Sequence, residues 1–581
     1  MSSAQPSNQD IIRVWADIGG TFTDCFVLAN HQRREIKVLS SGLTRTKVRS
    51  YLGDHRFSLE SFPGADIPHF WNGASAILSD QKGHMIDLGK INHQNSESIG
   101  VENANPSALT DLSGDLTFEI DAKLEAPALA THLLLGIPLL DPLPELDVRL
   151  GTTKGTNALL TRAGAKMALL VTKGFGDLLA IGEQDRPDLF ALQIQKTDPL
   201  TDYIIEIDER LDATGEILKT INEKQIESDL ALAVEQGIDA VAICLLHSHL
   251  NPEHEQRIAT IAQRCGITNI SLSTDVAPLI KYVARTETTT LDAYLNPILS
   301  CYLGRVWQQF GGVERCRLQM MTSNGNLVEP GAFQGKDSIL SGPAGGVIAL
   351  GDLAIKTGHS KVVGLDMGGT STDVSRFEGQ VGRRYESKIA GIRVMNPMMD
   401  IETVAAGGGS ICGISEMGRL TVGPQSAGSE PGPACYGKGG PLTITDVNLL
   451  LGRIPTDRFP FPLDVTAAKN KLTQQANKLP PSKTLSVEEL ADGFFDIAIT
   501  HMGEAVRTVT TAQGSDVRDM ALAGFGGAAG QHLCRIADTL EIKTIIDHPD
   551  SGLLAHWVSV SQNWVALQPT GSIKSGMVHP N

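Results

Sequence analysis

The sequence predicts an α/β fold in which helices cover mostly parallel or mixed sheets. Strand and helix patterns alternate through LDVRLGTTKGTNALLTRAGAKMALLVTKGFGDLL and through DAVAICLLHSHLNPEHEQRIATIAQRCG, and such alternation is typical of sheets flanked by helices. Two nearly identical glycine turns between apolar runs, and a third glycine cluster ahead of a helical pattern, place loops at strand ends.

One octet occurs twice. Asp17–Asp24 reads DIGGTFTD and Asp366–Asp373 reads DMGGTSTD, with six of the eight positions identical. Each copy joins two apolar runs, which predicts strand, turn and strand. Paired glycines let the backbone and its amides approach a phosphate. A purely structural turn is the alternative, but the duplication and the flanking aspartates favour nucleotide binding.

The residues of the octets suggest separate roles. Mg²⁺ is held by carboxylates, usually through water, so Asp17 and Asp366 are the predicted Mg²⁺ ligands and catalytic residues. The chain has no GxxxxGK[ST] segment, which excludes a Walker-type loop. The predicted phosphate-binding residues are Gly19, Gly20, Thr21, Thr23, Gly368, Gly369, Thr370 and Thr372.

A third glycine cluster lies in ALAGFGGAAGQHLCRIADTL, residues 521–540. An apolar strand runs into Gly524, Gly526 and Gly527, and a helix is expected from about Ala528. Glycines at a helix N-terminus suit a nucleotide, so these three are predicted to bind the nucleotide; tight helix–strand packing is the alternative. Two phosphate turns and a late glycine–helix unit are typical of the actin, Hsp70 and sugar-kinase superfold. There, two ribonuclease-H-like halves close on ATP.

Composition narrows the class of partner. The net charge of −17 gives no basic footprint for nucleic acid or anionic membrane, and no apolar run reaches the roughly 20 residues of a membrane span. The opening MSSAQPSNQD lacks the features of a signal peptide. Eight single cysteines without CxxC favour a reducing compartment. We therefore expect a cytoplasmic protein.

Two other groups of residues are interpreted as structural. His247, His249 and His254 do not have the spacing of a usual zinc site. Cys435 has no neighbouring base in the sequence to activate it. The segment SVEELADGFFDIAITHMGEAVRTVT is predicted to be an amphipathic core helix.

The ordered motifs resemble the ATP-dependent 5-oxoprolinase and hydantoinase A family, to which acetone carboxylase β subunits are related. They include DIGGTFTDCFV, SGPAGGV, GLDMGGTSTDVSR, VAAGGGSI and VGPQSAGSEPGPACYGKGGPLTITDVNLLLGR. The resemblance implies an N-terminal region over residues 11–200 and a hydantoinase A-like ATP-binding region over 201–552. Residues 53–145 have no match and are predicted to be a β-rich insertion, with a partly mobile excursion as the alternative.

The resemblance also implies an activity. Members use ATP to hydrolyse a five-membered cyclic amide, most directly 5-oxo-L-proline to L-glutamate in glutathione metabolism, by phosphorylating the lactam oxygen. A hydantoinase B-like half, on the same chain or as a partner subunit, completes the enzyme, and an oligomer is expected. An ATP-dependent hydantoinase is the enzymatic alternative, and an inactive nucleotide-binding scaffold is the alternative of another class. The resemblance implies that Gly526 and Gly527 face the adenosine and, by family position, that Gly407, Gly408 and Gly409 shape the substrate side.

Residues 553–581 do not fit the family pattern. The expected continuation resembles SGxLSALGxxLA, whereas the chain reads LLAHWVSVSQNWVALQPTGSIKSGMVHPN. A frame shifted by two nucleotides permits LLSALGIGLAKLG. We therefore interpret the tail as the product of a frameshift near Leu553, which would leave a truncated ATP-binding half; a divergent short tail is the alternative.

Overall fold

The computed structural model describes most of the chain. The described residues are 11–20, 22–79, 84–103, 116–184, 186, 189–190, 192–194, 196–428, 431–459, 463–480 and 485–548. Thr21 and the tail 553–581 lie outside them, so the predictions made for both stay predictions.

The first sheet contains the first octet. Its strand order is β18-β17-β10-β1-β2-β3. Strands β1, β2 and β3 are antiparallel neighbours, whereas β10 runs parallel to both β1 and β17. Its strands are β1 (Ile12–Ile18), β2 (Phe22–Ala29), β3 (Gln32–Leu39), β10 (Leu146–Thr152), β17 (Cys316–Met321) and β18 (Leu327–Val328).

The second sheet contains the second octet and repeats this arrangement. Its order is β25-β20-β19-β28-β29, with β19, β20 and β25 antiparallel and with β28 parallel to β19 and β29. Its strands are β19 (Lys361–Met367), β20 (Thr372–Glu378), β25 (Ile401–Val404), β28 (Ala521–Phe525) and β29 (Thr544–Asp547). Five strands therefore have the same order and directions in both sheets.

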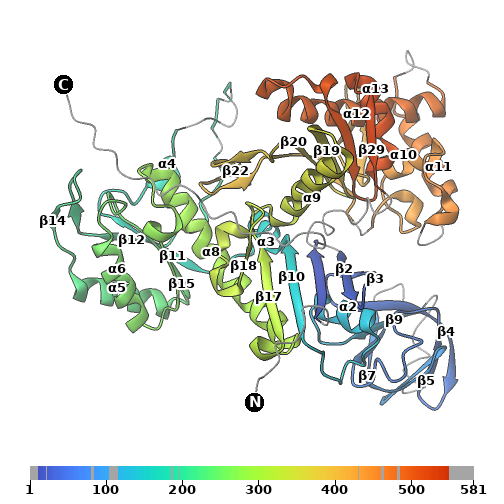
Figure 1. Cartoon of the computed structure of the whole chain (residues 1–581), viewed down its shortest axis with the longest axis horizontal. Coiled ribbons are helices and arrows are strands. Elements are labelled where there is room, and N and C mark those ends of the chain that lie inside the picture. The colour runs from blue at the N-terminus through green and yellow to red at the C-terminus, as the bar shows by residue number, and fades with distance from the viewer. Residues whose placement is uncertain are drawn as a thin grey trace.

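One helix joins the two halves. Helix α9 (Ser341–Thr357) packs against β10 and β17 of the first sheet and against β19 and β20 of the second, and it lies between them in Figure 1. Its sequence SGPAGGVIALGDLAIKT is rich in small residues, which lets strands approach it closely. The two octets are thereby brought to opposite sides of one helix.

A closed barrel is inserted between β3 and β10. Its order is β4-β5-β8-β7-β6-β9, and Figure 1 shows it at the lower right. The barrel is followed by α2 (Ala126–Leu135). It begins at Leu43, before the expected boundary near residue 53, because the alternating LTRTKVRSYLG continues as a strand. Its strands are β4 (Leu43–Gly53), β5 (Arg56–Leu59), β6 (Ser75–Ser79), β7 (Met85–Gln94), β8 (Ser98–Val101) and β9 (Thr117–Asp121).

A smaller parallel sheet lies at the left of Figure 1, with order β12-β11-β15-β16. Every residue of MALLVT in β11 and AVAIC in β15 is buried, as expected for parallel strands covered on both faces. Its elements are β11 (Met167–Thr172), α4 (Leu178–Ile181), β12 (Ile204–Ile207), α5 (Glu223–Glu235), β15 (Ala240–Cys244), α6 (Glu253–Arg264), β16 (Asn269–Leu272) and α7 (Ser273–Val276).

The remaining elements cover or connect these sheets. The predicted core helix is α12, which starts after a capping box between Ser486 and Glu489 and buries Phe494 and Phe495. The others are α3 (Lys154–Leu160), β13 (Arg210–Leu211), β14 (Ile217–Lys219), α8 (Tyr282–Gln309), β21 (Arg383–Arg384), β22 (Ser387–Ile389), β23 (Ile392–Val394), β24 (Met398–Met399), β26 (Ser410–Ile414), β27 (Leu420–Ser426), α10 (Ile444–Leu450), α11 (Val465–Ala476), α12 (Val487–Val509) and α13 (Leu533–Leu540).

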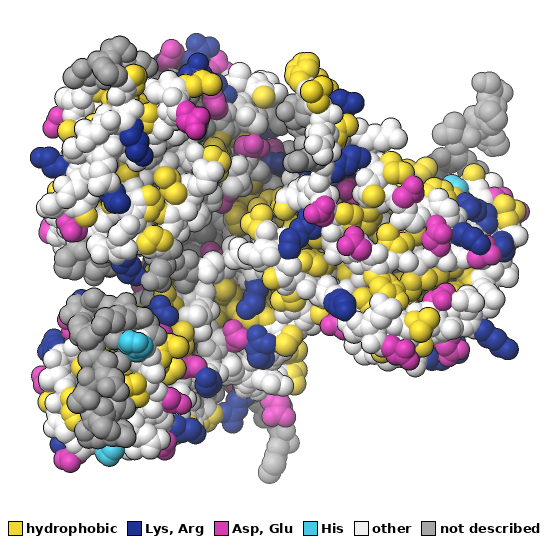
Figure 2. Space-filling view, turned by 180° about the vertical axis from the view of Figure 1, so that it is seen from behind, with side chains coloured by type: hydrophobic (Ala, Val, Ile, Leu, Met, Phe, Trp, Pro, Cys, Tyr) yellow, Lys and Arg dark blue, Asp and Glu magenta, His cyan; other side chains and the backbone are white. Residues whose placement is uncertain are grey.

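The surface carries charges of both signs. On the face in Figure 2, acidic and basic side chains are interspersed over the described residues. None of the helices in the described part of the chain is long and apolar enough to cross a membrane.

Candidate active site

The two octets form the same hairpin turn. The Gly19 amide donates to the Phe22 carbonyl at 3.0 Å, and the Gly368 amide donates to the Ser371 carbonyl at 3.1 Å. In each hairpin the first aspartate of the octet lies opposite the last across the strand pair. The repeated sequence thus produces a repeated geometry.

The outer surfaces of the turns are open. Gly20 is exposed in the first turn, and Gly368, Gly369 and Thr370 are exposed in the second. A Cβ added to Gly369 would have no atom within 4 Å. These backbone segments therefore have free space on one side, as a phosphate-binding loop requires.

The two buried threonines hold the turns from beneath. Thr23 and Thr372 are both 0% exposed. The Thr23 hydroxyl is 3.0 Å from Ser40 Oγ, which donates to the Gly19 carbonyl at 2.8 Å. The Thr372 hydroxyl donates to the Ala406 carbonyl at 2.5 Å. In this structure both hydroxyls bond within the protein.

The glycine triplet 407–409 lies directly beneath the second turn. The Gly408 and Gly409 amides donate to the carbonyls of Gly368 and Gly369 at 3.1 and 2.6 Å. A Cβ on Gly407 would be only 2.6 Å from the Thr370 carbonyl carbon. Only glycine fits there, so the described contacts of this triplet support the turn.

The aspartates of both sheets are electrostatically coupled. Burial raises the pKa of Asp366 to about 7, and the nearby carboxylates of Asp373 and Asp17 add to the rise. Burial also raises the pKa of Asp373 to about 6, although the Thr403 hydroxyl donates to it at 2.6 Å and opposes the shift. The carboxylates of Asp17 and Asp373 thus oppose the ionisation of Asp366, and a bound cation would relieve this repulsion.

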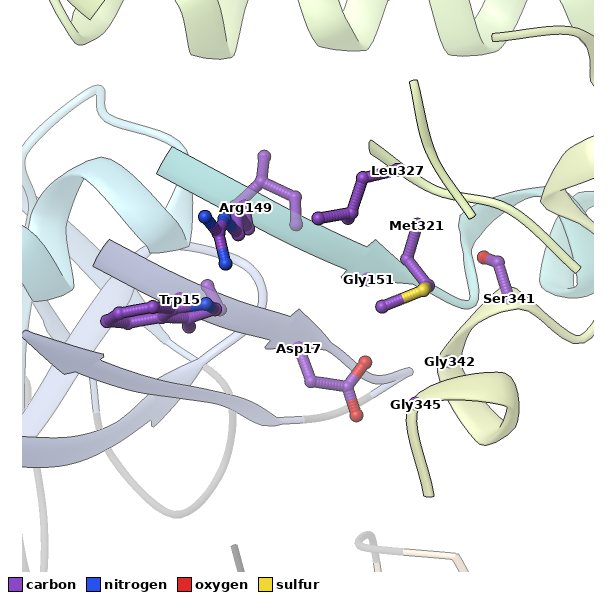
Figure 3. Close-up of a pocket in the computed structure, with 11 residues that line it drawn as sticks. Trp15, Asp17, Arg149, Gly151, Met321, Leu327, Ser341, Gly342 and Gly345 are labelled. Carbon is purple, nitrogen blue, oxygen red and sulfur yellow. The ribbon is translucent and has the colours of Figure 1, made fainter. Parts of the chain in front are cut away.

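Asp17 lies against the N-terminus of α9. Cβ atoms built on Gly151 and Gly342 would be 3.2 and 3.4 Å from Asp17 Oδ1. Figure 3 shows this carboxylate directed toward Gly342 and Gly345 at the start of α9. The positive end of a helix dipole favours an ionised carboxylate at this position.

The three glycines of the third cluster have different surroundings. Gly526 has a φ of 76°, and a Cβ on it would lie 2.4 Å from the Met367 carbonyl oxygen and 2.7 Å from Asp366 Oδ1. Gly527 is exposed with open space around it. Gly524 is buried in β28, where a Cβ would be 2.4 Å from Leu533. Gly526 therefore adjoins Asp366, Gly527 follows it with open space, and Gly524 allows helix–strand packing.

The helix after this cluster begins later than predicted. A short 3-10 turn occupies Ala529–Gln531, and α13 starts at Leu533 instead of near Ala528. Gly530 lies within this turn, and glycine disfavours an α-helix.

His254 and Cys435, which the sequence suggested to be structural, each lie beside an acidic side chain. His254 Nδ1 is 2.7 Å from Glu209 Oε2, and both side chains are fully buried. Burial and the nearby Asp446 raise the pKa of the Cys435 thiol, which disfavours a nucleophilic thiolate. Among the described residues, no group of three or more His, Cys, Asp or Glu side chains is arranged to hold a metal ion.

Sequence reasoning did not assign four residues that lie around Asp17, Asp366 and Asp373. Asp373 closes the second octet, and that symmetry with Asp24 was the available signal. Trp15 and Arg149 line a pocket with Asp17, but they lie on strands separated by the barrel insertion. Thr403 reaches Asp373 from β25, and no local motif marks it.

Comparison with known proteins identifies the family. The model of the hydantoinase/oxoprolinase N-terminal region matches residues 146–266, and the hydantoinase/oxoprolinase model matches residues 285–559. The chain belongs to the hydantoinase/oxoprolinase family. The second match extends a few residues into the tail that begins at Leu553.

Individual relatives agree with this membership. The 5-oxoprolinase of Saccharomyces cerevisiae is 41% identical over 460 residues, which cover 72% of this chain and 36% of the yeast protein. This chain therefore spans little more than a third of that relative.

Solved structures share the mixed α/β fold. The ATP-dependent caprolactamase of Pseudomonas jessenii matches with a TM-score of 0.66 and 26% identity, over 94% of this chain and 70% of that chain. A nucleotide-free acetone carboxylase gives the same TM-score and coverage at 21% identity, which supports the fold alone.

Proposed function

We propose that this chain binds Mg·ATP and phosphorylates a five-membered cyclic amide, 5-oxo-L-proline, for hydrolysis to L-glutamate. The observation that carries the proposal is the pair of matching turns whose aspartates interact across two sheets of the same strand order. Membership of the hydantoinase/oxoprolinase family supports the substrate class, and the ATP-dependent caprolactamase is a relative named for a lactam.

The finer fold assignment is the actin, Hsp70 and sugar-kinase superfold. Three antiparallel strands followed by two parallel ones in each sheet support two ribonuclease-H-like halves. In this arrangement ATP would occupy the cleft between them, with α9 at its base and one octet on each side.

The turns fit a nucleotide. Gly19, Gly20 and Thr21 would hold phosphates from the first half, and Gly368, Gly369 and Thr370 from the second. Thr23 and Thr372 would position these turns from beneath. Gly526 and Gly527 would face the adenosine, with Gly524 allowing α13 to pack close to β28. The support is the open space at the exposed glycines together with their close-packed underside.

The aspartates fit Mg²⁺. Asp17 and Asp366 would hold the ion, with water and phosphate oxygens completing its coordination. Mg²⁺ is usually bound by one or two carboxylates together with substrate phosphates, so no preformed protein cage is required, and Asp17 and Asp366 interact electrostatically across the two sheets. Asp373, fixed by Thr403, would add negative charge nearby.

Bound Mg·ATP would supply the phosphoryl group that activates the lactam oxygen. The residues of this chain hold the phosphates in place, neutralise charge through the bound ion and orient the acceptor, which are the main requirements of phosphoryl transfer. Asp17 and Asp366 are the proposed catalytic residues on this basis.

The complete enzyme would include a hydantoinase B-like half or subunit and act as an oligomer. The short coverage of the yeast 5-oxoprolinase supports a further half. All eight cysteines are free thiols, which supports a reducing cytoplasmic location and the proposed place in glutathione metabolism.

The test is ADP release by the purified chain with Mg²⁺, with and without 5-oxoproline. Stimulation by 5-oxoproline that is lost in Asp366→Asn is expected. ATP binding without stimulation, restored by a B-like partner, would assign this chain the scaffold role instead. Stimulation by hydantoin but not 5-oxoproline would assign the hydantoinase activity.

A further inference from the structure

A small pocket adjoins Asp17 on the face of the first sheet that α9 covers. Figure 3 shows Trp15 and Arg149 at one end, Met321 and Leu327 along one side, and the Asp17 carboxylate near the start of α9. The principal lining residues are Trp15, Asp17, Arg149, Met321, Leu327 and Gly342. A ligand here would lie beside the proposed Mg·ATP site.

Trp15 offers this pocket an unused hydrogen-bond donor. Its side chain is only 3% exposed, and its Nε1 has no acceptor among the described residues. The indole is held by stacking on Phe26, with ring centroids 4.6 Å apart. A buried N–H without an acceptor is costly, so a ligand acceptor would relieve this cost.

Arg149 makes the same end of the pocket electropositive. Its guanidinium carbon is 5.6 Å from the Trp15 ring centroid, and its Nη2 is 3.3 Å from Asp147 Oδ2. Arg13 and Arg317 are also close enough to act on it electrostatically. Arg13 and Arg317 lie opposite Asp147 on the two neighbouring strands, so three arginines and one aspartate leave a local excess of positive charge in an acidic chain.

The other end of the pocket differs in chemistry. Asp17 both lines the pocket and interacts with Asp366 of the second sheet. Met321 and Leu327 provide apolar contact between the two ends. The pocket therefore has a donor and positive charge at one end, an apolar middle and the proposed phosphoryl-transfer site at the other.

We infer that this pocket binds the cyclic-amide substrate and selects a lactam that carries a carboxylate. Trp15 Nε1 donates to the carboxylate, Arg149 provides its counter-charge, and the ring packs on Met321 and Leu327. The lactam oxygen then faces the Asp17 end, where phosphoryl transfer is proposed. This inference rests on the proposed function and favours 5-oxoproline over neutral hydantoins and lactams.

The test is calorimetric titration of the full chain with 5-oxo-L-proline and with 2-pyrrolidinone, the same ring without the carboxylate. The wild-type chain is expected to bind 5-oxoproline about tenfold or more tightly than 2-pyrrolidinone. Trp15→Phe should weaken 5-oxoproline binding about fivefold, and Arg149→Gln about tenfold or more.

A matched control separates these losses from misfolding. Trp307→Phe removes an indole whose Nε1 already donates to the Cys316 carbonyl at 3.0 Å, so it should leave 5-oxoproline binding unchanged. Mg·AMP-PNP binding and melting temperature are measured for every variant. The comparison of the two ligands on the wild-type chain needs no variant.

The outcomes distinguish the inference from the proposed function. Equal binding of the two ligands, wild-type affinity in both Trp15→Phe and Arg149→Gln, or no 5-oxoproline binding by a chain that binds Mg·AMP-PNP would overturn the pocket assignment alone. Failure to bind Mg·AMP-PNP would contradict the proposed function.

Discussion

The two glycine turns share a sequence but differ in what surrounds them. The first is supported beneath by the Ser40 hydroxyl, and its Asp17 meets the N-terminus of α9. The second is supported by the backbone of Gly407–Gly409, and its Asp366 meets two other carboxylates. The first aspartate of the octet therefore lies beside a helix N-terminus in one half and near other carboxylates in the other half.

This difference indicates a division of roles. Asp17 lies beside a helix N-terminus, whose dipole favours negative charge, whereas Asp366 has a raised pKa of about 7, so a bound cation would favour its ionised form near neutral pH. The second half is thus expected to depend more strongly on Mg²⁺, and its turn is expected to tolerate less change.

The largest effect is expected for Asp366→Asn. Turnover that depends on Mg·ATP should fall by about 100-fold or more, because a proposed ligand of the ion is lost. The metal-free protein should melt about 1–3 °C higher at pH 8, because a carboxylate destabilised by its neighbours is removed. ADP release and thermal melting measure these two results.

The matched control is Asp24→Asn in the first hairpin. Asp24 pairs with Lys37 at 2.5 Å, so both turnover and melting temperature should change little. Normal turnover in Asp366→Asn would contradict the assignment of that carboxylate.

Gly407→Ala is expected to have the next largest effect. Its Cβ would press on the Thr370 carbonyl carbon at 2.6 Å, so the second turn must move and Mg·ATP affinity should fall by about tenfold or more. Gly413→Ala is the control, since its Cβ would meet only the Thr421 hydroxyl at 3.4 Å. Equal affinities in the two variants, measured by calorimetry, would show that the triplet does not support the site.

The effect of pH on Mg²⁺ affinity should be smaller than the effects of these substitutions, and it should change gradually with pH. Asp366 and Asp373 have raised pKa values of about 7 and about 6, so protons compete with Mg²⁺ below neutrality. Affinity should rise from pH 5.5 to about pH 8 and then level off. The rise of Mg²⁺ affinity with pH should be less steep in Asp366→Asn, and an unchanged pH dependence would argue against the titration of this carboxylate.

Asp366 and Asp373 also affect the stability of the metal-free protein, which should fall with rising pH while Mg²⁺ affinity rises. Because their folded-state pKa values are raised, the folded protein binds more protons than the unfolded chain between about pH 4 and pH 7. Their contribution to the free energy of unfolding is therefore lost as pH rises through this window. Melting curves without Mg²⁺ would record the trend.

Ser40→Ala is expected to have the smallest effect. It removes the hydroxyl that donates to the Gly19 carbonyl and contacts Thr23, a loss of about 0.5–1.5 kcal/mol. Mg·ATP affinity should fall roughly twofold to tenfold, less than in Gly407→Ala. Ser41→Ala is the neighbouring control. A larger loss of Mg·ATP affinity in Ser40→Ala than in Gly407→Ala would contradict the expectation that the second turn tolerates less change than the first.

The sequence predicted those parts of the site that repeat locally. The octets DIGGTFTD and DMGGTSTD predict their turns, because the glycine pair and the aspartates of each turn are close together in the sequence. Thr23 and Thr372 were predicted to bind phosphate on the same basis, yet their hydroxyls bond to protein groups beneath the turns. The strand pattern indicates which face of the sheet a side chain lies on, but it does not specify the hydrogen-bond partner.

The parts that depend on long-range packing could not be predicted. Arg149 meets Trp15 only because β10 returns beside β1 after the barrel, and Gly342 meets Asp17 only through α9. The start of the barrel at Leu43 was also not predicted, because the strand pattern gives no sign of where the first sheet ends and the barrel begins. Such contacts are set by topology and not by local sequence.

The central claim is that Asp17 and Asp366 act on one bound ion, and a double-mutant cycle for Mg·ATP affinity tests it most directly. Asp17→Asn and Asp366→Asn should each weaken binding by about tenfold or more, and the double variant should be weakened by clearly less than the product of the two effects. Fully additive losses, or wild-type affinity in either single variant, would contradict a shared site.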